Sequence, residues 1–263
     1  MSRPRASIGT GAEAPAKSNK TRLDNALVAR ELAPSRNIAR SLIMAGKVFS
    51  GTDRLDKPGR LVAADTLLEV RGPSHEWVSR GGLKLQHGLD HFAIAVEGRI
   101  ALDIGASTGG FTDVLVSRGA EKVYAVDVGR GQLAWRLRNH PRVVVIEGVN
   151  ARYLSRHEIP DAIDVIVCDA SFIGLKTLLP ASLALAAPGA DLIALIKPQF
   201  EVGKGRVGKG GIVRDPGLHQ EVCDRIKQWL SQEAGWDVAG IEESPITGQR
   251  GNKEFLIFAN LRG

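Results

Sequence analysis

The sequence predicts an α/β protein whose main domain is built on a mostly parallel sheet, preceded by a small α+β module. From residue 100 onward, apolar strand-like runs alternate with helical segments, which implies a parallel sheet covered on both faces. The first of these runs ends in a glycine-rich turn that opens a helix. The last two runs, 236–242 and 254–260, have no helix between them, so we expect them to pair antiparallel at one edge of the sheet.

Composition allows one large domain, or a domain with a small module, within 263 residues. Apolar residues make up 43% of the chain, enough for a substantial core, and Lys plus Arg outnumber Asp plus Glu by 35 to 29. This excess suits a polyanionic partner such as RNA, although many basic proteins bind no nucleic acid.

Several function classes are disfavoured by what the chain lacks. No apolar run approaches the roughly 18 residues of a transmembrane helix, and the N-terminus has no apolar secretory region. Cys168 and Cys223 share no metal or redox spacing and are expected to be reduced, buried thiols. His87 and His91 stand four residues apart, but without further ligands they favour a surface pair over a metal site. We therefore expect a cytoplasmic protein with no metal and no membrane partner.

The N-terminal part is expected to divide into an arm and a module. Residues 1–20 are rich in Ser, Ala, Pro, Gly and Lys and are predicted to be a disordered basic arm. Residues 21–74 form the module, with short strands near 48–49 and 67–70. Its first helix has an apolar face, and its second should begin after Ser35 as N-cap and end at Gly46. The apolar positions expected on these two helices are Leu23, Ala26 and Leu27, then Ile38, Ala39 and Leu42.

Arg36, Arg40 and Lys47 lie on or just after the second predicted helix, away from its apolar stripe. They could hold RNA phosphates, or they could form an ordinary solvated helix face. Spacing alone leaves both interpretations open.

Residues 75–99 are expected to be a linker with a lead-in helix, and residues 100–263 the main domain. The predicted strands are 100–104, 122–126, 143–146, 163–168 and 191–196, followed by the antiparallel pair 236–242 and 254–260. The predicted helices are 110–118, 173–186 and 217–231.

The turn after the first strand, within 101-ALDIGASTGGFTDVL-115, is typical of a nucleoside cofactor site. Gly105 permits a tight turn and close approach of a ligand to the backbone. Asp127 ends the next strand, where a carboxylate can hold both ribose hydroxyls. A dinucleotide site would require G-x-G-x-x-G facing a pyrophosphate, whereas this turn reads G-A-S-T-G-G after Asp103. A carboxylate there suits the ammonium of S-adenosylmethionine better than phosphates, or it could simply cap backbone amides of the turn.

A rival phosphate site at 203-GKGRVGKG-210 nearly matches the P-loop pattern. It ends in Gly210 where a magnesium-binding hydroxyl is required, and 198-PQFEV-202 separates it from the preceding strand. A basic loop near an RNA substrate, carrying Lys204, Arg206 and Lys209, fits better.

Charged residues stand at the ends of the later strands, where an open α/β sheet places its ligands. Asp169 ends 163-IDVIVCD-169, and Lys197 ends 191-DLIALIK-197. Glu254 begins the last strand; if this strand runs antiparallel, its start lies at the same edge. Lys84 precedes the first strand and cannot be placed in this way.

The chain resembles two known families. Residues 22-RLDNALV-28, 35-SRNIARSLIMAGKV-48 and 55-LDKPG-59 resemble an S4 RNA-binding domain. The remainder resembles the TlyA family of ribosomal RNA 2′-O-methyltransferases, also called hemolysin A. The matching segments are 77-WVSRGGLKL-85, 102-LDIGASTGGFTDVL-115, 124-YAVDVGRGQL-133, 136-RLRNHPRV-143, 168-CDASFIGL-175, 195-LIKPQFEVG-203, 209-KGGIVRD-215 and 251-GNKEFL-256.

This resemblance implies a class I methyltransferase fold with a Rossmann-like sheet. It also implies S-adenosylmethionine as cofactor, cytidine 2′-hydroxyls of 16S and 23S rRNA as acceptors, and a catalytic tetrad of Lys84, Asp169, Lys197 and Glu254. The residues expected to bind the cofactor are Asp103, Gly105, Ser107, Thr108, Gly109, Asp127, Val128, Asn150, Asp169 and Phe172. Those expected to bind RNA are Arg22, Arg36, Arg40, Lys47, Arg80, Lys204, Arg206 and Lys209.

Two segments depart from the family pattern: 147-EGVNAR-152 lacks an Arg-Thr pair before Asn-Ala-Arg, and 248-GQRGN-252 replaces Gly-Pro-x-Gly-Asn. We expect the first to affect the cofactor or tetrad surroundings and the second a loop near Glu254.

The expected chemistry explains the tetrad. A ribose 2′-hydroxyl is a weak nucleophile, and a nearby ammonium, assigned to Lys197, would stabilise the developing alkoxide and help to deprotonate the hydroxyl. Asp169 and Glu254 would orient the two lysines, and Lys84 would complete the charge balance and help position the ribose.

Two alternative functions are an RNA-binding ribosome assembly factor without methyl transfer and a membrane-active hemolysin. The oligomeric state is not determined by sequence, with a monomer slightly favoured.

Overall fold

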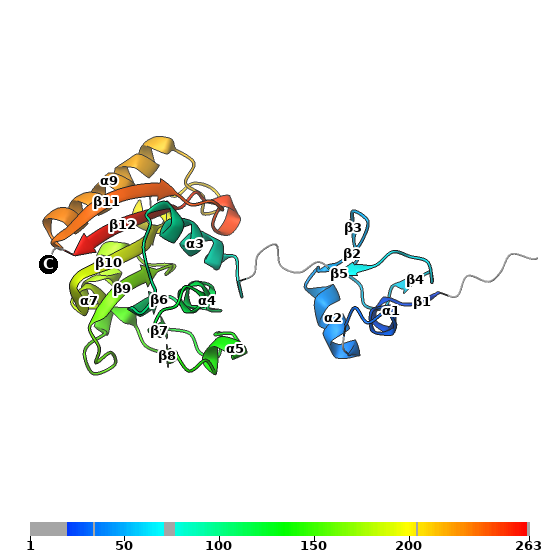
Figure 1. Ribbon diagram of the computed structural model, residues 1–263. Helices are drawn as coiled ribbons and strands as arrows, with labels where there is room; N and C mark the ends of the chain where they lie inside the picture. The colour runs from blue at the N-terminus through cyan, green and yellow to red at the C-terminus, as the bar shows by residue number, and fades with distance from the viewer. Residues whose placement is uncertain (1–19, 34, 71–76, 204, 262–263) are drawn as a thin grey trace, which may run out of the picture. The chain divides into compact units, whose positions relative to one another are not determined.

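The computed structural model describes residues 20–33, 35–70, 77–203 and 205–261 (Figure 1). It divides between Ser74 and His75 into two compact units. Residues 1–19, which include most of the predicted basic arm, and Lys204 lie outside the described residues. Each unit is therefore described by itself.

The first unit packs two helices, α1 (Leu23–Ala29) and α2 (Arg36–Met44), beside short strands. β1 (Thr21–Arg22) pairs antiparallel with β4 (Leu61–Val62). β2 (Val48–Ser50) pairs antiparallel with β3 (Asp53–Arg54) and with β5 (Glu69–Val70). Its core contains the predicted face of α1 together with residues from α2 and the strands: Leu23, Ala26, Leu27, Ala39, Ile43, Val48, Leu55 and Val62.

Both predicted ends of α2 are observed. The Ser35 side chain accepts a hydrogen bond from the backbone N–H of Ile38 at 3.4 Å. At the other end Gly46 has φ +67° and donates to the carbonyl of Ile43, while Lys47 donates to that of Leu42. This pair of bonds is a Schellman motif, and it satisfies carbonyls that the helix end would leave unpaired.

The predicted apolar stripe of α2 was partly wrong. Ala39 and Ile43, four residues apart, are fully buried, whereas Ile38 is 45% exposed. Successive residues of a helix point about 100° apart, so a face centred on Ala39 and Ile43 turns Ile38 toward solvent.

The second unit is built on a seven-stranded sheet in the order β11-β12-β10-β9-β6-β7-β8. Five strands are parallel: β6 (Ile100–Ile104), β7 (Lys122–Asp127), β8 (Val143–Glu147), β9 (Ile163–Cys168) and β10 (Ala186–Ile196). β12 (Phe255–Leu261) runs antiparallel between β10 and the edge strand β11 (Trp236–Glu243). The predicted antiparallel pairing of the last two strands is therefore confirmed.

Helices cover both faces of this sheet (Figure 1). α3 (Gly81–His91) and α4 (Gly110–Ser117) pack on one face, and α6 (Leu175–Leu178), α7 (Pro180–Leu183) and α9 (Pro216–Gln232) on the other. Within β6 the side chains alternate, with Ala101 in the first layer and Leu102 and Ile104 in the second. α5 (Trp135–Arg138), α8 (Pro198–Glu201) and the 3-10 turns η1 (Ala151–Tyr153) and η2 (Gln249–Gly251) complete the unit.

The predicted helix 173–186 is instead two short helices, α6 and α7, and β10 begins at Ala186 rather than at residue 191. Pro180 occupies the first position of α7. Because proline has no N–H, it cannot donate the hydrogen bond that would continue α6 into α7. The pairing register of β10 shifts between Ala186 and Asp191, where Gly189 adopts φ +76°.

Candidate active site

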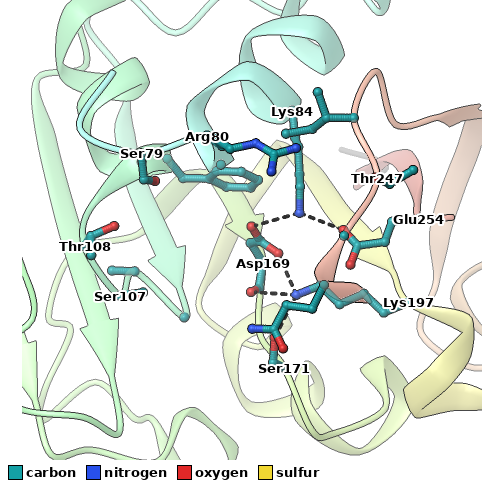
Figure 2. A pocket seen from close by; sticks show the side chains of 18 of the residues that line it. Ser79, Arg80, Lys84, Ser107, Thr108, Asp169, Ser171, Lys197, Thr247 and Glu254 are labelled. Carbon is teal, nitrogen blue, oxygen red and sulfur yellow. Dashed lines mark hydrogen bonds and ion pairs between the residues drawn. The ribbon is translucent and has the colours of Figure 1, made fainter. Parts of the chain in front are cut away.

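Two lysines and two acids meet at one edge of the sheet (Figure 2). Asp169 follows the carboxyl end of β9, Lys197 follows that of β10, and Glu254 directly precedes the antiparallel strand β12. Ile196 and Phe255 are register partners, which brings Lys197 and Glu254 to the same edge. Lys84 reaches the cluster from α3, so the structure brings together all four residues of the tetrad expected from the resemblance.

The four side chains form a continuous chain of charges. Lys84 Nζ lies 2.6 Å from Glu254 Oε2 and 3.5 Å from Asp169 Oδ2. Lys197 Nζ lies 2.7 Å from Asp169 Oδ1, and it also donates to the Asp169 carbonyl at 3.1 Å and to Ser171 Oγ at 3.0 Å. The lysine side chains are 9% and 7% exposed and Glu254 is 3% exposed. Two positive and two negative charges thus balance in a largely dehydrated site, as buried charges require.

These residues line a cavity of about 480 Å³. Arg80, Ser107 and Thr108 also line it, together with Phe200 and the loop residues Ile246 to Gln249. A single cavity wall therefore combines the charge cluster with part of the glycine-rich turn.

A second cavity of about 500 Å³ adjoins the first. Its lining contains many of the residues expected to hold a cofactor: Gly105, Ser107, Asp127, Val128, Asn150, Asp169 and Phe172. Gly105, Ser107, Asp169 and Ser171 line both cavities, so Asp169 is the tetrad residue that stands where the two spaces meet, while the other three line the first cavity.

The glycine-rich turn requires its glycines. Gly105 has φ +81°, and a Cβ there would lie 2.9 Å from the Cα of Ala170. Gly109 has φ +98°, and a Cβ there would lie 2.4 Å from Leu137 Cδ1. Both positions therefore combine a left-handed backbone with a close contact. Gly109 is buried and lies outside the linings of both cavities, so its role in the turn is structural.

Asp127 adjoins the turn through its carboxylate. Oδ2 accepts from the backbone N–H of Ser107 at 2.8 Å, and Oδ1 accepts from that of Gly129 at 2.6 Å. Each oxygen keeps a further acceptor site, and Asp127 lines the second cavity. The side chain is fixed in position and can still accept hydrogen bonds from a diol.

Asp103 does not face either cavity, contrary to the expectation that its carboxylate meets a ligand ammonium. It is fully buried, and Oδ2 accepts from the Thr112 hydroxyl at 2.6 Å. Oδ1 is buried without a hydrogen-bonding partner among the described residues. Burial raises the pKa of this carboxyl to about 7. The alternating pleat of β6 explains the correction, because it directs residue 103 into the layer between the sheet and α4.

Three polar residues of the site were missed from the sequence. Ser171 contacts Lys197, Gln199 Nε2 lies 3.5 Å from Glu254 Oε1, and Gln132 lies 3.4 Å from the Ser107 hydroxyl. Ser171 and Gln199 each stand two residues after a tetrad residue at a strand end. That position was the available signal, since loops at this edge of a sheet carry ligand-binding groups.

The two departures from the family pattern both adjoin the site. Glu147 pairs with Arg138 and accepts from the N–H of Gly131, and it thereby supports the loop next to Asp127. Gly248 packs against the Glu254 carboxylate, so closely that a Cβ would lie 1.9 Å from Oε1. Of the residues that differ from the family pattern, Val149 lines the second cavity and Gln249 lines both cavities, so both departures lie at the site, and their effect stays a prediction.

The residues expected to bind RNA differ in their surroundings. In the first unit Arg22 and Arg36 form ion pairs of 3.1 and 3.0 Å with the buried Asp24, while Arg40 remains exposed. The two paired guanidinium groups lower the pKa of the Asp24 carboxyl to about 2. Arg22 and Arg36 therefore have a structural role, which the helix pattern did not reveal.

In the second unit Arg80 lines the mouth of the first cavity (Figure 2). Lys209 is exposed, whereas Arg206 forms an ion pair with Glu221 at 2.6 Å and donates to the carbonyl of Val202.

Across the described part of the chain, no helix is both long and apolar enough to cross a membrane.

Comparison with known proteins identifies both units. A profile of FtsJ-like methyltransferases matches residues 77–261, and one of the S4 domain matches residues 21–67. The chain is 50% identical over 240 residues to the 16S/23S rRNA (cytidine-2′-O)-methyltransferase TlyA of Mycobacterium tuberculosis, covering 91% of this chain and 89% of that protein. It is 40% identical to Hemolysin A of Brachyspira hyodysenteriae, covering 89% and 98%. A solved structure of a candidate hemolysin from Streptococcus thermophilus superposes with a TM-score of 0.72 at 40% identity, covering 93% and 90%.

Proposed function

Because this chain belongs to the FtsJ-like methyltransferases, within the TlyA family, and carries an S4 domain, we propose that it methylates the 2′-hydroxyl of cytidine in ribosomal RNA. The acceptors would lie in 16S rRNA, 23S rRNA or both, and S-adenosylmethionine would be the methyl donor. The observation that carries this proposal is the buried cluster of Lys84, Asp169, Lys197 and Glu254, which lines the first cavity and reaches the second through Asp169.

The donor set of the second cavity fits S-adenosylmethionine. Asp127 offers a fixed carboxylate for a ribose diol, Asn150 offers an amide, and Val128 and Phe172 offer exposed apolar surface for a base. When bound, the cofactor supplies an activated methyl group. Asp169, which lines both cavities, would be the acid that meets its ammonium, a role that the sequence analysis had considered for Asp103.

Lys197 is the group that we assign to the 2′-hydroxyl. Its ammonium is held by an ion pair with Asp169 Oδ1 and by hydrogen bonds to the Asp169 carbonyl and to Ser171 Oγ, and it is therefore fixed before a substrate enters. A fixed positive charge in a dehydrated site would stabilise the negative charge that develops on the hydroxyl oxygen, and the proton would pass to water in the cavity, because Lys197 as an ammonium cannot accept it. Because the charge is already oriented, little reorganisation is required during the reaction.

Lys84 and Glu254 would support this arrangement from the opposite side. Lys84 neutralises Glu254 and approaches the second oxygen of Asp169, so Asp169 cannot turn away from Lys197 without losing both contacts. We assign Lys84 a role in positioning the ribose as well, since it lines the cavity with Arg80. RNA would be held by the S4 unit through Arg40 and Lys47, and by Arg80 at the cavity mouth.

Transfer of tritium from labelled S-adenosylmethionine tests the proposal. Purified protein should label 30S or 50S subunits, and mapping of 2′-O-methylation should locate the label on cytidine. Lys197→Ala should reduce turnover by at least about 100-fold, since general acid–base and oxyanion groups each contribute at this scale. Lys253→Ala is the matched control and should retain activity, because Lys253 is an exposed lysine just before β12, the strand that pairs with β10.

Calorimetric binding of the cofactor and circular dichroism would show that Lys197→Ala is folded and loaded. Wild-type turnover by that folded variant would contradict the role of Lys197. Absence of label in every rRNA would instead favour an assembly factor. The hemolysin names of relatives are tested separately, by dye release from protein-free liposomes, and we expect none.

A further inference from the structure

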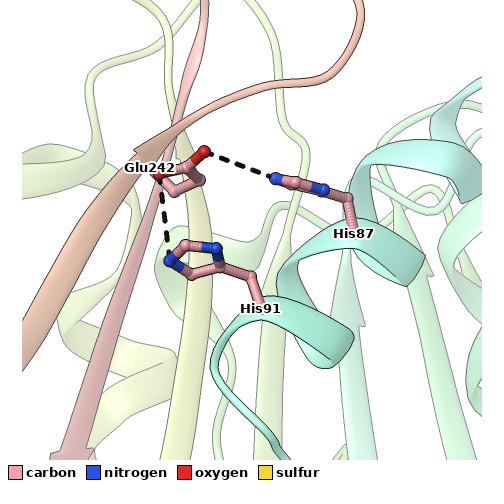
Figure 3. Close-up of side chains that lie close together, drawn as sticks. All are labelled: His87, His91 and Glu242. Carbon is pink, nitrogen blue, oxygen red and sulfur yellow. Dashed lines mark ion pairs between the residues drawn. The ribbon is translucent and has the colours of Figure 1, made fainter.

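Three side chains outside the active site converge on one point of the second unit. His87 and His91 project from α3 toward Glu242 on β11 (Figure 3). His87 Nε2 lies 3.6 Å from Glu242 Oε1, and His91 Nε2 lies 3.8 Å from Oε2. One ligand atom from each of the three side chains lies within 4.8 Å of the other two.

We propose that His87, His91 and Glu242 form a binding site for a transition-metal ion of the zinc class. The sequence favoured a surface pair because it offered two histidines and no third ligand. The fold supplies that ligand from a residue 151 positions beyond His91. Two imidazoles and one carboxylate are a recurrent zinc donor set, and the remaining position is left to water.

The distances agree with coordination. Zinc binds imidazole nitrogen and carboxylate oxygen at about 2.0–2.2 Å, and a tetrahedral arrangement then separates neighbouring ligand atoms by about 3.3 Å. The two nitrogen–oxygen distances exceed this value by less than 1 Å. The three ligand atoms lie within 4.8 Å of one another, so rotations of the two imidazoles and the carboxylate would be needed to bring them to these separations. Two histidines four residues apart on a helix face are a known zinc-binding spacing.

A second observation points to a ligand. Nε2 of His87 is shielded from solvent and has no hydrogen-bonding partner among the described residues, although its side chain as a whole is 35% exposed. A shielded ring nitrogen without a partner is costly unless something satisfies it. A metal ion beside Glu242 would satisfy it.

The surroundings hold the ligands in place. The ring of His91 packs edge-on against Phe92 with centroids 4.7 Å apart, and Phe92 stacks on Phe258 of β12 at 5.2 Å. Glu242 is held by the pairing of β11 with β12, where its register partner is Leu256. Support of this kind orients metal ligands before the ion binds.

An ion bound at this site would connect α3, the helix that carries Lys84, to β11. Lys84, His87 and His91 lie at i, i+3 and i+7 of α3 and therefore share one face of the helix. Lys84 contacts Glu254 at the start of β12, while the histidines contact β11 beside it. A bound ion would clamp α3 to β11 and hold the helix that carries Lys84. The inference does not depend on the proposed function, since it concerns binding and stability.

Calorimetric titration of untagged, full-length, chelator-treated protein with Zn²⁺ tests the proposal. We expect one equivalent to bind with a Kd in the micromolar range or tighter and the Tm of the second unit to rise with Zn²⁺ concentration. His91→Ala and Glu242→Gln should each weaken binding by at least about ten-fold. His157→Ala is the matched control, because His157 is 91% exposed and pairs with Glu158 at 3.1 Å but has no second histidine.

Chelator-treated variants must keep the wild-type far-ultraviolet dichroism and Tm, which separates loss of a ligand from loss of the fold. Co²⁺ provides an independent readout, since its visible absorption should show a low-coordinate site in the wild type and not in Glu242→Gln. Failure of the wild type to bind Zn²⁺ below about 100 μM would overturn the proposal. So would equal binding by Glu242→Gln and wild type, and the cluster would then be only an ion-paired histidine group.

Discussion

Glu254→Gln isolates the contribution of the buried charge pair to the stability of the second unit. Lys84 and Glu254 are 9% and 3% exposed and 2.6 Å apart, so the substitution leaves a buried ammonium beside a neutral amide. Breaking a buried pair by removing one partner costs about 3–5 kcal/mol. Asp169 remains 3.5 Å from Lys84, and glutamine retains an acceptor oxygen, so we expect a loss of about 2–3 kcal/mol.

The assay is urea unfolding followed by tryptophan fluorescence. All four tryptophans follow residue 75, so the signal reports on the second unit alone. Glu243→Gln is the matched control, because Glu243 lies on the neighbouring strand and pairs with Lys253 at 2.9 Å, but both side chains are about half exposed. Screening by water makes that pair weak, so its loss should change stability little.

A double substitution completes the test. Lys84→Met combined with Glu254→Leu removes both charges and should recover most of the stability lost in Glu254→Gln. Equal stability of Glu254→Gln and Glu243→Gln would refute the reasoning, since the buried site would then tolerate an unbalanced charge.

Three further predictions follow from buried ionisable groups. The pKa of Asp24 is lowered to about 2 by Arg22 and Arg36, so its contribution to stability is present above about pH 4 and is lost as pH falls toward 2. Asp24→Asn should remove this acid dependence and lower the free energy of unfolding of the first unit by about 1 kcal/mol at neutral pH. Amide exchange of residues 21–70 in the full chain measures both effects, and an unchanged dependence of stability on acid pH would contradict the prediction. Burial raises the pKa of Asp103 to about 7, so the folded state holds a proton that the unfolded state has released, and stability should fall as pH rises from about 4 to 7. In Asp103→Asn, the urea midpoint of unfolding should fall less between pH 5 and pH 8 than it does in the wild type. An equal fall in both proteins would argue against this role of Asp103. Burial raises the pKa of the Cys168 thiol to about 12, so iodoacetamide should label Cys168 in urea but not in native protein at pH 8; rapid native labelling, detected by mass spectrometry, would show that the thiol is accessible.

Much of the fold could be predicted because its signals are local. The strands of the main sheet are apolar runs bounded by turn residues, and the cap of α2 at Ser35 and its end at Gly46 depend on the residues themselves. Two predictions about helices were wrong. The predicted helix 173–186 is divided at Pro180, and the buried face of α2 is set by packing; the 3.6-residue periodicity of apolar residues reveals neither.

The candidate site was partly predictable for a topological reason. Asp169, Lys197 and Glu254 stand at strand ends, and parallel strands with one antiparallel neighbour bring such ends to one edge. Lys84 was placed only by resemblance, because a residue on a helix before the first strand has no register to fix it. Asp103 was misplaced because the spacing of residues around a turn does not tell which face of the pleat a side chain occupies.

The sequence by itself determined the parallel sheet, the glycine-rich turn and the residue types available for methyl transfer, because strand periodicity and the backbone freedom of glycine act within a few residues. Only the tertiary structure decided which charges meet. It joined Lys84 to Glu254 across 170 positions, turned Asp103 into the core and tied Arg36 to Asp24. It also brought Glu242 to the two histidines of α3. The physical reason is that the energy of a charge depends on its neighbours and on its distance from water, and both are set by packing between segments remote in sequence.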